Sequence, residues 1–222
     1  MKERITIGAC WDGRDYYPVD YIHRLYNSVL RNTSYPFDFV LNIGPLAEKR
    51  RHEIRSEIRV IQTGLPYWWS GMQFWALSPD GVETDTLLYL DLDVVILGSL
   101  DDIIEFPSDQ AYMKGYPNTN VSVSLLRYGS GWRVFGEYFR AGMPQWDPLA
   151  PPSNRALPLA AQSILDDPKY GLKYDFFPES WVCSYKLRVL KSGLPDDCRI
   201  VAFHGRPKQH ECNESWIKDN WR

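Results

Sequence analysis

The chain has 222 residues, of which 44% are hydrophobic and 24% charged, a composition typical of a globular protein rather than a disordered or fibrous one. Its formal net charge of −3 argues against the global positive field that draws proteins to nucleic acid or to anionic membranes. No apolar run approaches the roughly 18 residues that a membrane span needs. Residues 1–5 lead directly into a strand-like run without a signal-peptide core, and the four cysteines lack zinc-site spacing. We therefore expect a cytoplasmic protein with reduced thiols.

The first third of the chain alternates between strand and helix patterns. Residues 4–9 are typical of a strand that ends in a turn cluster at 10–13. From Pro18 to Leu30 the apolar residues recur at three- and four-residue spacing, which predicts an amphipathic helix with the proline at its start. Strand, helix, strand in this order favours a parallel sheet with helical crossovers. Further strands are expected at 37–43 and 60–61, on either side of a charged helix or extended loop at 47–58.

The sequence patterns that predict the remaining elements are less distinct. A helix is expected at 72–77, and Asp101 and Asp102 favour the start of a short helix because carboxylates are preferred in a first turn. Residues 144–158 carry five prolines and indicate an irregular loop. Strands are expected at 87–90, 121–126 and 200–203.

Two carboxylates follow the most apolar of these strands. Residues 87–90 are continuously apolar, as in a strand buried on both faces, and Asp91 and Asp93 come where it ends. Ligands of open α/β sheets bind outside the carboxyl ends of the strands. Side chains two positions apart point to the same side of an extended chain. A divalent cation that bridges both carboxylates to a phosphate would satisfy them, whereas helix capping or ion pairing is the structural alternative.

A second signal lies near the C-terminus. The strand expected at 200–203 ends on His204 and then turns at Gly205. Glycine lets a backbone approach a phosphate closely, and Lys208 would supply a positive charge for it. The histidine is either a ligand or a structural side chain, and its position alone does not decide between the two.

Taken together, these segments resemble metal-dependent GT-A-fold glycosyltransferases, similar to glycosyltransferase family 8 and its small bacterial and phage-type relatives. The resemblance implies an α/β fold with a mixed, mostly parallel sheet flanked by helices. It also implies one domain over 1–222, with a nucleotide-binding half at about 1–104 and an acceptor-side half at about 105–222. The segments that carry the resemblance are 21–26 with 32–37, 88–101, 184–186 and 203–208, of which 88–101 and 203–208 together are the most specific.

The resemblance implies transfer of a sugar from a nucleotide-diphosphate sugar, most often a UDP-sugar, to an acceptor, with retention of anomeric configuration. Mn²⁺ or Mg²⁺ would be bound by Asp91, Asp93 and His204, and an imidazole among the ligands suits Mn²⁺ better. Gln162 would lie beneath the reacting anomeric carbon and join Asp91 and Asp93 in the catalytic group. The other donor contacts would be Ala9, Cys10 and Tyr16 around the nucleotide, Asn120 and Ser122 at the sugar, and Gly205 and Lys208 at the diphosphate.

Two positions depart from the pattern of the family. Ala161 stands where an aspartate precedes the glutamine, which removes one sugar contact. Gly71 stands where a basic residue follows the tryptophan pair at 68–69, which removes one expected phosphate contact, and Arg127 and Lys114 are the candidates to replace it. The tryptophans themselves are expected to pack in the protein rather than to stack on substrate.

Other interpretations of the same residues remain open. In a haloacid-dehalogenase-type phosphohydrolase, Asp91 would be the nucleophile, Asp93 the general acid, and the pair at 166–167 late metal ligands. A nucleotidyltransferase of similar fold would release pyrophosphate, and a non-catalytic module would bind a sugar or nucleotide without turnover. The default acceptor is a saccharide or another small molecule. A modified base in phage-type DNA is the minority acceptor, suggested by the arginines at 50, 51, 55 and 59.

Overall fold

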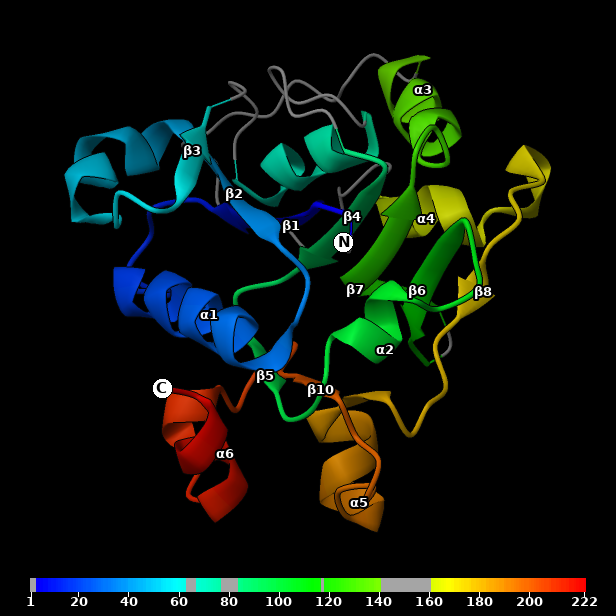
Figure 1. Cartoon of the computed structure of the whole chain (residues 1–222). Coiled ribbons are helices and arrows are strands. Elements are labelled where there is room, and N and C mark those ends of the chain that lie inside the picture. The colour runs from blue at the N-terminus through cyan, green and yellow to red at the C-terminus, as the bar shows by residue number, and fades with distance from the viewer. Residues whose placement is uncertain (1–2, 63–66, 77–83, 117, 141–160) are drawn as a thin grey trace.

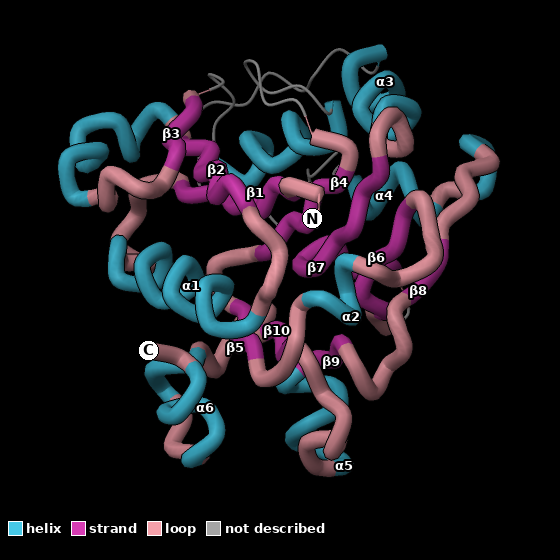
Figure 2. Tube along the Cα trace, viewed as in Figure 1, coloured by secondary structure: helices cyan, strands magenta, loops and turns pink. Residues whose placement is uncertain are grey.

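The computed structural model describes residues 3–62, 67–76, 84–116, 118–140 and 161–222, and the side chains of 67–70 lie outside this description. The described strands form a seven-stranded sheet in the order β3-β2-β1-β4-β7-β6-β8 and a three-stranded sheet in the order β5-β10-β9. Figure 1 and Figure 2 show the small sheet below the large one. The strands of the large sheet are β1 (Ile5–Trp11), β2 (Phe37–Ile43), β3 (Arg59–Ile61), β4 (Thr86–Leu90), β6 (Gln110–Lys114), β7 (Thr119–Arg127) and β8 (Asp175–Phe176). Those of the small sheet are β5 (Val94–Ile96), β9 (Val182–Ser184) and β10 (Ile200–Ala202).

The large sheet is mixed and mostly parallel, as the sequence predicts. β1 pairs in parallel with both β2 and β4, and β2 pairs in parallel with β3. β7 runs antiparallel to its neighbours β4 and β6, while β8 is parallel to β6. Because β1 leads through a helix to β2 on one side and has β4 on its other side, a crevice opens at the carboxyl ends of β1 and β4.

Helices cover both faces of the large sheet. The α-helices are α1 (Val19–Asn32), α2 (Asp101–Ile104), α3 (Trp132–Arg140), α4 (Ala161–Asp166), α5 (Leu190–Ser192) and α6 (Ser215–Asn220). The 3-10 helices are η1 (Pro45–Glu53), η2 (Tyr67–Ala76), η3 (Pro168–Tyr170) and η5 (Gln209–Glu211), and η4 (Tyr185–Val189) is a π-helix. Among the described residues, no helix combines the length and the apolar character that crossing a membrane requires.

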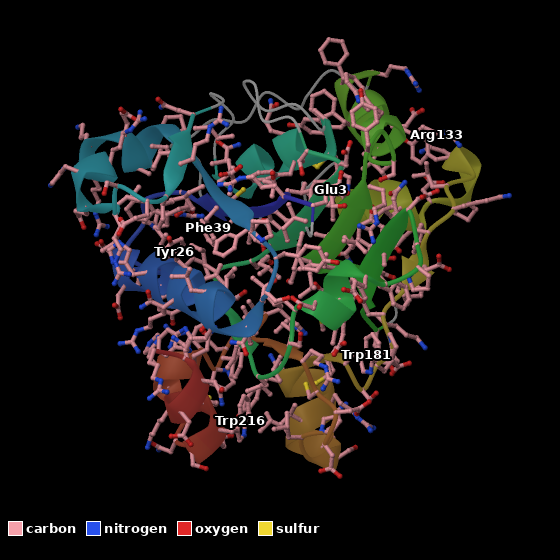
Figure 3. The ribbon with its side chains drawn as sticks, in the orientation of Figure 1. Glu3, Tyr26, Phe39, Arg133, Trp181 and Trp216 are labelled. Atoms are coloured by element: carbon pink, nitrogen blue, oxygen red, sulfur yellow. The ribbon has the colours of Figure 1, made fainter. Side chains whose placement is uncertain are left out.

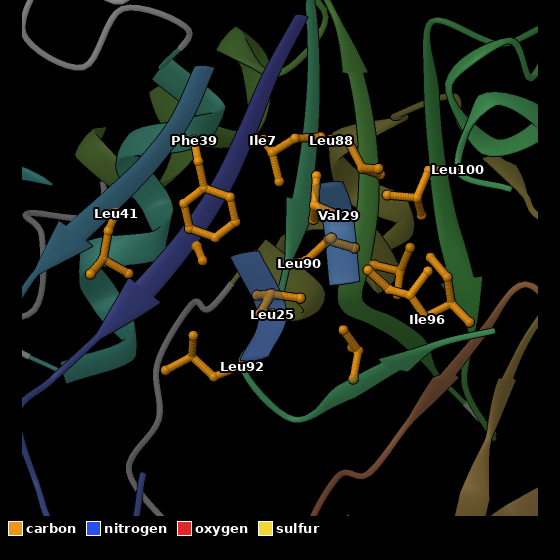
Figure 4. Close-up of a cluster of buried hydrophobic side chains, with 14 of the residues drawn as sticks. Ile7, Leu25, Val29, Phe39, Leu41, Leu88, Leu90, Leu92, Ile96 and Leu100 are labelled. Atoms are coloured by element: carbon orange, nitrogen blue, oxygen red, sulfur yellow. The ribbon is translucent and has the colours of Figure 1, made fainter. Parts of the chain in front are cut away.

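One face of the sheet packs against α1. The apolar stripe that predicts this helix is buried, with Leu25 and Val29 at 2% and 0% exposure. These side chains meet Ile7 of β1 and Leu88 of β4 in the main core, as Figure 4 shows. Burial of such a stripe supplies most of the stability of a surface helix.

The opposite face packs against η2, α3 and α4. Phe74 and Trp75 of η2 are buried against Tyr89 of β4, and Tyr138 of α3 and Ile164 of α4 belong to the same cluster. Successive side chains of β4 alternate between this cluster and the core on the α1 side. Because both faces of β4 are buried and its side chains alternate between them, the run at 87–90 is apolar at every position.

The small sheet has its own apolar cluster near the C-terminus. Tyr185 of η4 stacks on Phe203, with ring centroids 4.3 Å apart, and Trp216 of α6 lies beside both rings. Figure 3 shows Trp216 between α6 and α5. A hydrogen bond joins the residue after α6 to α1: Arg24 Nη1 donates to the carbonyl of Trp221 at 2.7 Å.

Several expected elements need correction. The first strand does not end at residue 9 but continues through Trp11, because Cys10 and Trp11 pair with β2. The charged segment expected at 47–58 forms the 3-10 helix η1, and the helix expected at 72–77 is the 3-10 helix η2, which begins at Tyr67. β5, β6, β8 and β9 were not predicted, since each has at most five residues, and β5 and β8 pair with strands that are distant in the chain. The proline-rich segment at 144–158 lies outside the described residues.

Candidate functional site

Asp91 and Asp93 lie at the carboxyl end of β4, at the crevice beside β1. The chain turns at Leu92 and Asp93 rather than continuing as a strand, which corrects the expectation of an extended backbone here. Alternation nevertheless persists, because Leu92 is buried in the main core with Leu90, as Figure 4 shows. The backbone N–H of Asp91 donates to the carbonyl of Ser122 at 2.8 Å. This hydrogen bond to β7 fixes the backbone at Asp91.

Asp93 is buried and has a cationic partner. Its Oδ2 accepts a hydrogen bond from the Tyr17 hydroxyl at 2.8 Å and contacts the ammonium of Lys208. Lys208 is itself 2% exposed and donates to the Phe203 carbonyl at 2.9 Å and to the Tyr17 hydroxyl at 2.7 Å. The lysine that the sequence assigns to a diphosphate thus lies at the carboxylate pair, with its ammonium bound by protein groups.

The negative charge of Asp91 is less fully neutralised by protein groups than that of Asp93. Its Oδ1 accepts a hydrogen bond from the Tyr89 hydroxyl at 2.8 Å. Burial and the neighbouring charge of Asp93 raise the pKa of Asp91 to about 6, although hydrogen bonds from Ser122 and Tyr89 act in the opposite direction. The two carboxylates therefore concentrate more negative charge than Lys208 alone offsets, which favours binding of a further cation.

Two cavities meet at Asp91. They share Tyr89 and Asp91, and their volumes of about 270 and about 300 Å³ lie near the lower end of small-molecule sites. The first is also lined by Cys10, Asp12, Arg14, Tyr16, Tyr17, Leu92 and Asp93. The second is also lined by Gly71, Met72, Trp75, Asn120, Val121, Ser122, Ala161, Gln162 and His204. The structure thus brings most of the sequence-predicted site residues to one connected region.

His204 reaches the second cavity, but it does not join the carboxylates as a ready ligand set. Its Nε2 lies 2.6 Å from the Ser184 hydroxyl. Burial lowers the pKa of His204, so the imidazole is neutral near pH 7 and retains a lone pair. Within the described part of the chain, no three His, Cys, Asp or Glu side chains are gathered closely enough to bind a metal ion. The expected set of Asp91, Asp93 and His204 is not assembled in this conformation.

Besides Lys208, two predicted contact residues lie away from the cavity walls. Ala9 is fully buried in the core on the α1 side, because the odd-numbered positions of β1 face that helix, so its side chain cannot line the nucleotide pocket. Gly205 is exposed and has φ = 77°, a conformation that favours glycine. A Cβ added to Gly205 would lie 3.9 Å from the ammonium nitrogen of Lys186, so that lysine lies beside the turn.

Sequence reasoning missed several residues at the first cavity. Arg14 donates to Asp12 from both its backbone N–H, at 3.0 Å, and its Nε, at 2.5 Å, so these two polar residues are held together in the turn after β1. Their position in the turn after the first strand is a signal that could have found them. Tyr17 and Tyr89 contact the two carboxylates, but only the Tyr89 contact is local in sequence.

The two departures from the family pattern both line the second cavity. A Cβ at Gly71 would lie 3.3 Å from the Tyr89 hydroxyl oxygen and 3.5 Å from Cys10 Sγ, so η2 approaches β1 and β4 closely here. Ala161 is 3% exposed and begins α4, one residue before Gln162. The side chains of the tryptophan pair at 68–69 lie outside the described residues.

The expected substitutes for the missing basic residue are engaged elsewhere. Arg127 lies opposite Thr86, at the start of β4, and donates to the Thr86 hydroxyl and to the Ile104 carbonyl, both at 2.6 Å. Lys114 pairs with Glu179 at 2.6 Å on the surface. Neither lines the cavities at Asp91, so the expectation that either reaches the phosphates is wrong for this conformation.

The phosphohydrolase alternative loses its late metal ligands. Asp166 accepts the backbone N–H of Thr119 at 3.0 Å, and Asp167 caps η3 by accepting the N–H of Lys169 at 3.0 Å. Neither aspartate lines the two cavities at Asp91. Both therefore have local structural roles.

Comparison with family models gives no match, and neither does comparison with curated proteins. Solved structures do match. An active-site mutant of LgtC aligns with a TM-score of 0.63 at 12% identity, covering 97% of this chain and 93% of that one. The glycosyltransferase GlyE of Streptococcus pneumoniae TIGR4 aligns at 0.61 and 16% identity, covering 93% and 56%. A glycosyltransferase involved in glycosylation of the major capsid of PBCV-1 aligns at 0.52 and 13% identity, covering 92% and 95%.

These neighbours define the class of fold. The chain has the GT-A fold of glycosyltransferases, as the sequence predicts. At such low identity the likeness extends to the fold alone, and the assignment to family 8 stays a prediction.

Proposed function

We propose that this protein is a metal-dependent glycosyltransferase that transfers a sugar from a nucleotide-diphosphate sugar, with a UDP-sugar as the first donor to test. The observation that supports the proposal most strongly is the position of Asp91. It joins two cavities at the carboxyl end of β4, beside a second carboxylate, in a chain with the GT-A fold. A donor substrate also has two parts, a nucleotide and a sugar, joined by a charged diphosphate.

The first cavity suits the nucleotide part. Tyr16 is 44% exposed and can offer a ring face to a base, while Asp12 and Arg14 provide hydrogen-bonding groups near it. The second cavity suits the sugar, with Asn120, Ser122 and Gln162 as its polar contacts. The diphosphate would then lie between the cavities, against Asp91 and Asp93.

The two aspartates fit a divalent cation. Their carboxylate oxygens are hard ligands, and the pKa of Asp91 is raised by burial and by the charge of Asp93, both of which a bound cation would offset. A bound Mn²⁺ or Mg²⁺ would stabilise the charge of the departing diphosphate as a Lewis acid. Because Nε2 of His204 is engaged by the Ser184 hydroxyl, a third metal bond would come from Nδ1, or from Nε2 once that contact breaks.

The transfer itself breaks the bond between the anomeric carbon and the phosphate oxygen, and the nucleoside diphosphate leaves with that electron pair. The acceptor oxygen forms the new bond to the same carbon, and its proton passes to the departing phosphate in a front-face reaction with retention. Lys186 beside Gly205 provides an exposed cation for the leaving group. A saccharide or another small molecule is the proposed acceptor.

The proposal is tested by a thermal-shift screen of UDP-, GDP- and CMP-sugars with and without Mn²⁺. A ligand that binds only the native state raises the melting temperature, so the true donor should give the largest shift, and only with the metal. Released nucleoside diphosphate, rather than pyrophosphate, then distinguishes sugar transfer from nucleotidyl transfer. Turnover of a nucleotide sugar eliminates the non-catalytic alternative, whereas no shift with any nucleotide contradicts the proposed function.

A further inference from the structure

The wall of the second cavity is divided into a polar and an apolar part. The polar side chains are Asp91, Asn120, Ser122, Gln162 and His204. The rest of the wall is mainly apolar and comes from η2, β4, β7 and α4. Its residues are Gly71, Met72, Trp75, Tyr89, Val121 and Ala161.

The aromatic side chains of this cavity have their polar atoms bonded to neighbouring protein groups. Trp75 Nε1 donates to the Tyr112 hydroxyl at 3.2 Å, and that hydroxyl donates in turn to Gln110. The Tyr89 hydroxyl donates to Asp91. These rings therefore present carbon atoms rather than hydrogen-bond donors to an occupant of the cavity.

The free energy of contact with the apolar part of this wall differs between the groups of a sugar. A hydroxyl that leaves water for an apolar surface loses hydrogen bonds that nothing replaces, whereas a methyl group gains by leaving water. Ala161 strengthens this contrast, because its methyl side chain lines the cavity beside the polar side chain of Gln162.

The following step rests on the proposed function, in which the sugar occupies the second cavity. We propose that the preferred donor carries a sugar with a methyl-bearing substituent, either an N-acetyl group or the methyl of a 6-deoxy sugar. The methyl group packs on the apolar wall formed by Met72, Val121 and Ala161. The ring hydroxyls face Asn120, Ser122 and Gln162 on the polar side.

Matched donor pairs test this specificity directly. In each pair the nucleotide is the same and the sugars differ in one substituent: UDP-N-acetylglucosamine against UDP-glucose, and dTDP-6-deoxyglucose against dTDP-glucose. Dissociation constants are measured by titration calorimetry with Mn²⁺, with UDP and dTDP alone as references. One methyl-sized group in an apolar pocket typically changes affinity by about tenfold or more, so at least one methyl-bearing donor should bind about tenfold more tightly than its partner. The pair that discriminates identifies which substituent is recognised.

Two substitutions examine the wall itself. Val121→Thr keeps the shape of the side chain but replaces one methyl with a hydroxyl, so it should reduce the preference within the discriminating pair several-fold. Ala161→Asp should reverse that preference by favouring the hydroxylated sugar. Val60→Thr makes the same exchange at a half-buried site on β3, away from the cavity, and should leave the preference unchanged. The valine exchange keeps the test valid if Ala161→Asp does not fold.

The outcomes separate this inference from the proposed function. If UDP and dTDP bind with Mn²⁺ but the hydroxylated donor binds as tightly as its partner in both pairs, the inference is overturned and the proposed function stands. An unchanged preference in a folded Val121→Thr variant also overturns it. If no nucleotide binds at all, both are overturned.

Discussion

The ammonium of Lys208 contacts the carboxylate of Asp93, 115 residues earlier in the chain, and the side chains are only 3% and 6% exposed. The backbone N–H of Lys208 also donates to Glu211 at 2.7 Å, which fixes the lysine at the start of η5. One buried ion pair thus joins the late C-terminal segment to the end of β4. The carboxylate pair of the candidate site therefore also contributes to the folded structure.

Lys208→Met should destabilise the protein by about 3–5 kcal/mol, because it leaves Asp93 buried without a counter-charge. Asp93→Asn should cost a similar amount, since it leaves the ammonium unpaired. The double variant should lose much less than the sum of the two, and urea unfolding of all four proteins measures the difference. Additive losses would show that the pair is not coupled. Mn²⁺ should restore part of the lost stability in Lys208→Met alone, where both carboxylates remain.

Asp91→Asn should abolish the Mn²⁺-dependent thermal shift with nucleotides and reduce turnover by at least about a hundredfold. It removes a proposed metal ligand and, with it, the negative charge of a side chain that lines both cavities. The fold should persist, since the asparagine Oδ1 still accepts the Tyr89 hydroxyl. Asp109→Asn makes the same exchange at an exposed position and serves as the control. Removal of metal with EDTA should reproduce the loss in the wild-type protein. A folded Asp91→Asn variant that retains the metal-dependent shift would contradict the metal proposal.

The Mn²⁺-dependent thermal shift should depend on pH below about 7. Burial and the charge of Asp93 raise the pKa of Asp91 from 3.8 to about 6. The folded, metal-free protein therefore binds the proton more tightly than the unfolded chain, and it loses stability as pH rises from about 4 to about 6. Metal binding must displace this proton, so the shift produced by Mn²⁺ should grow between about pH 5 and about pH 7 and then level off. Melting curves with and without the metal across this range measure the effect, and a shift independent of pH would contradict it.

The elements that the sequence predicts well are those whose burial pattern is local. The stripe of α1 and the apolar runs of β2 and β4 follow from the spacing of residues within one element. β5 and β8 are different, because they are short and pair with β10 and β6, which are far away in the chain. Local patterns cannot reveal such partners.

The same distinction holds at the candidate site. Asp91 and Asp93 are evident because they end an apolar strand, and His204 and Lys208 because they follow another one. Lys208 contacts Asp93 instead of facing outward toward a phosphate because its ammonium also donates to the Tyr17 hydroxyl, far away in the chain, and to the nearby Phe203 carbonyl. The mistaken position of Ala9 has a simpler cause, since strand alternation alone could have shown which face it occupies.

Lys186→Ala should weaken binding of the nucleoside diphosphate several-fold, because the exposed ammonium lies beside the Gly205 turn, where we propose that the diphosphate is recognised. The stability of the protein should change by less than about 1 kcal/mol, as is usual for exposed lysines. Lys191→Ala, at an exposed position in α5, is the matched control. Calorimetric titration of UDP with Mn²⁺ measures the affinity. Equal affinities for the two variants would exclude Lys186 as a diphosphate ligand.

Arg127→Met should destabilise the protein by about 2–3 kcal/mol, because it removes charged hydrogen bonds to the Thr86 hydroxyl and the Ile104 carbonyl, groups that lie between β4, β7 and α2. The affinity for nucleotides should not change, since Arg127 pairs with the first residue of β4 whereas Asp91 follows the last. Lys114→Met breaks only an exposed ion pair with Glu179 and should cost less than about 1 kcal/mol. Unfolding in urea and titration with UDP separate the two properties. A folded Arg127→Met variant with weakened nucleotide binding would mean that this arginine reaches the phosphates in a conformation other than the one described, and that the site extends beyond the two cavities at Asp91.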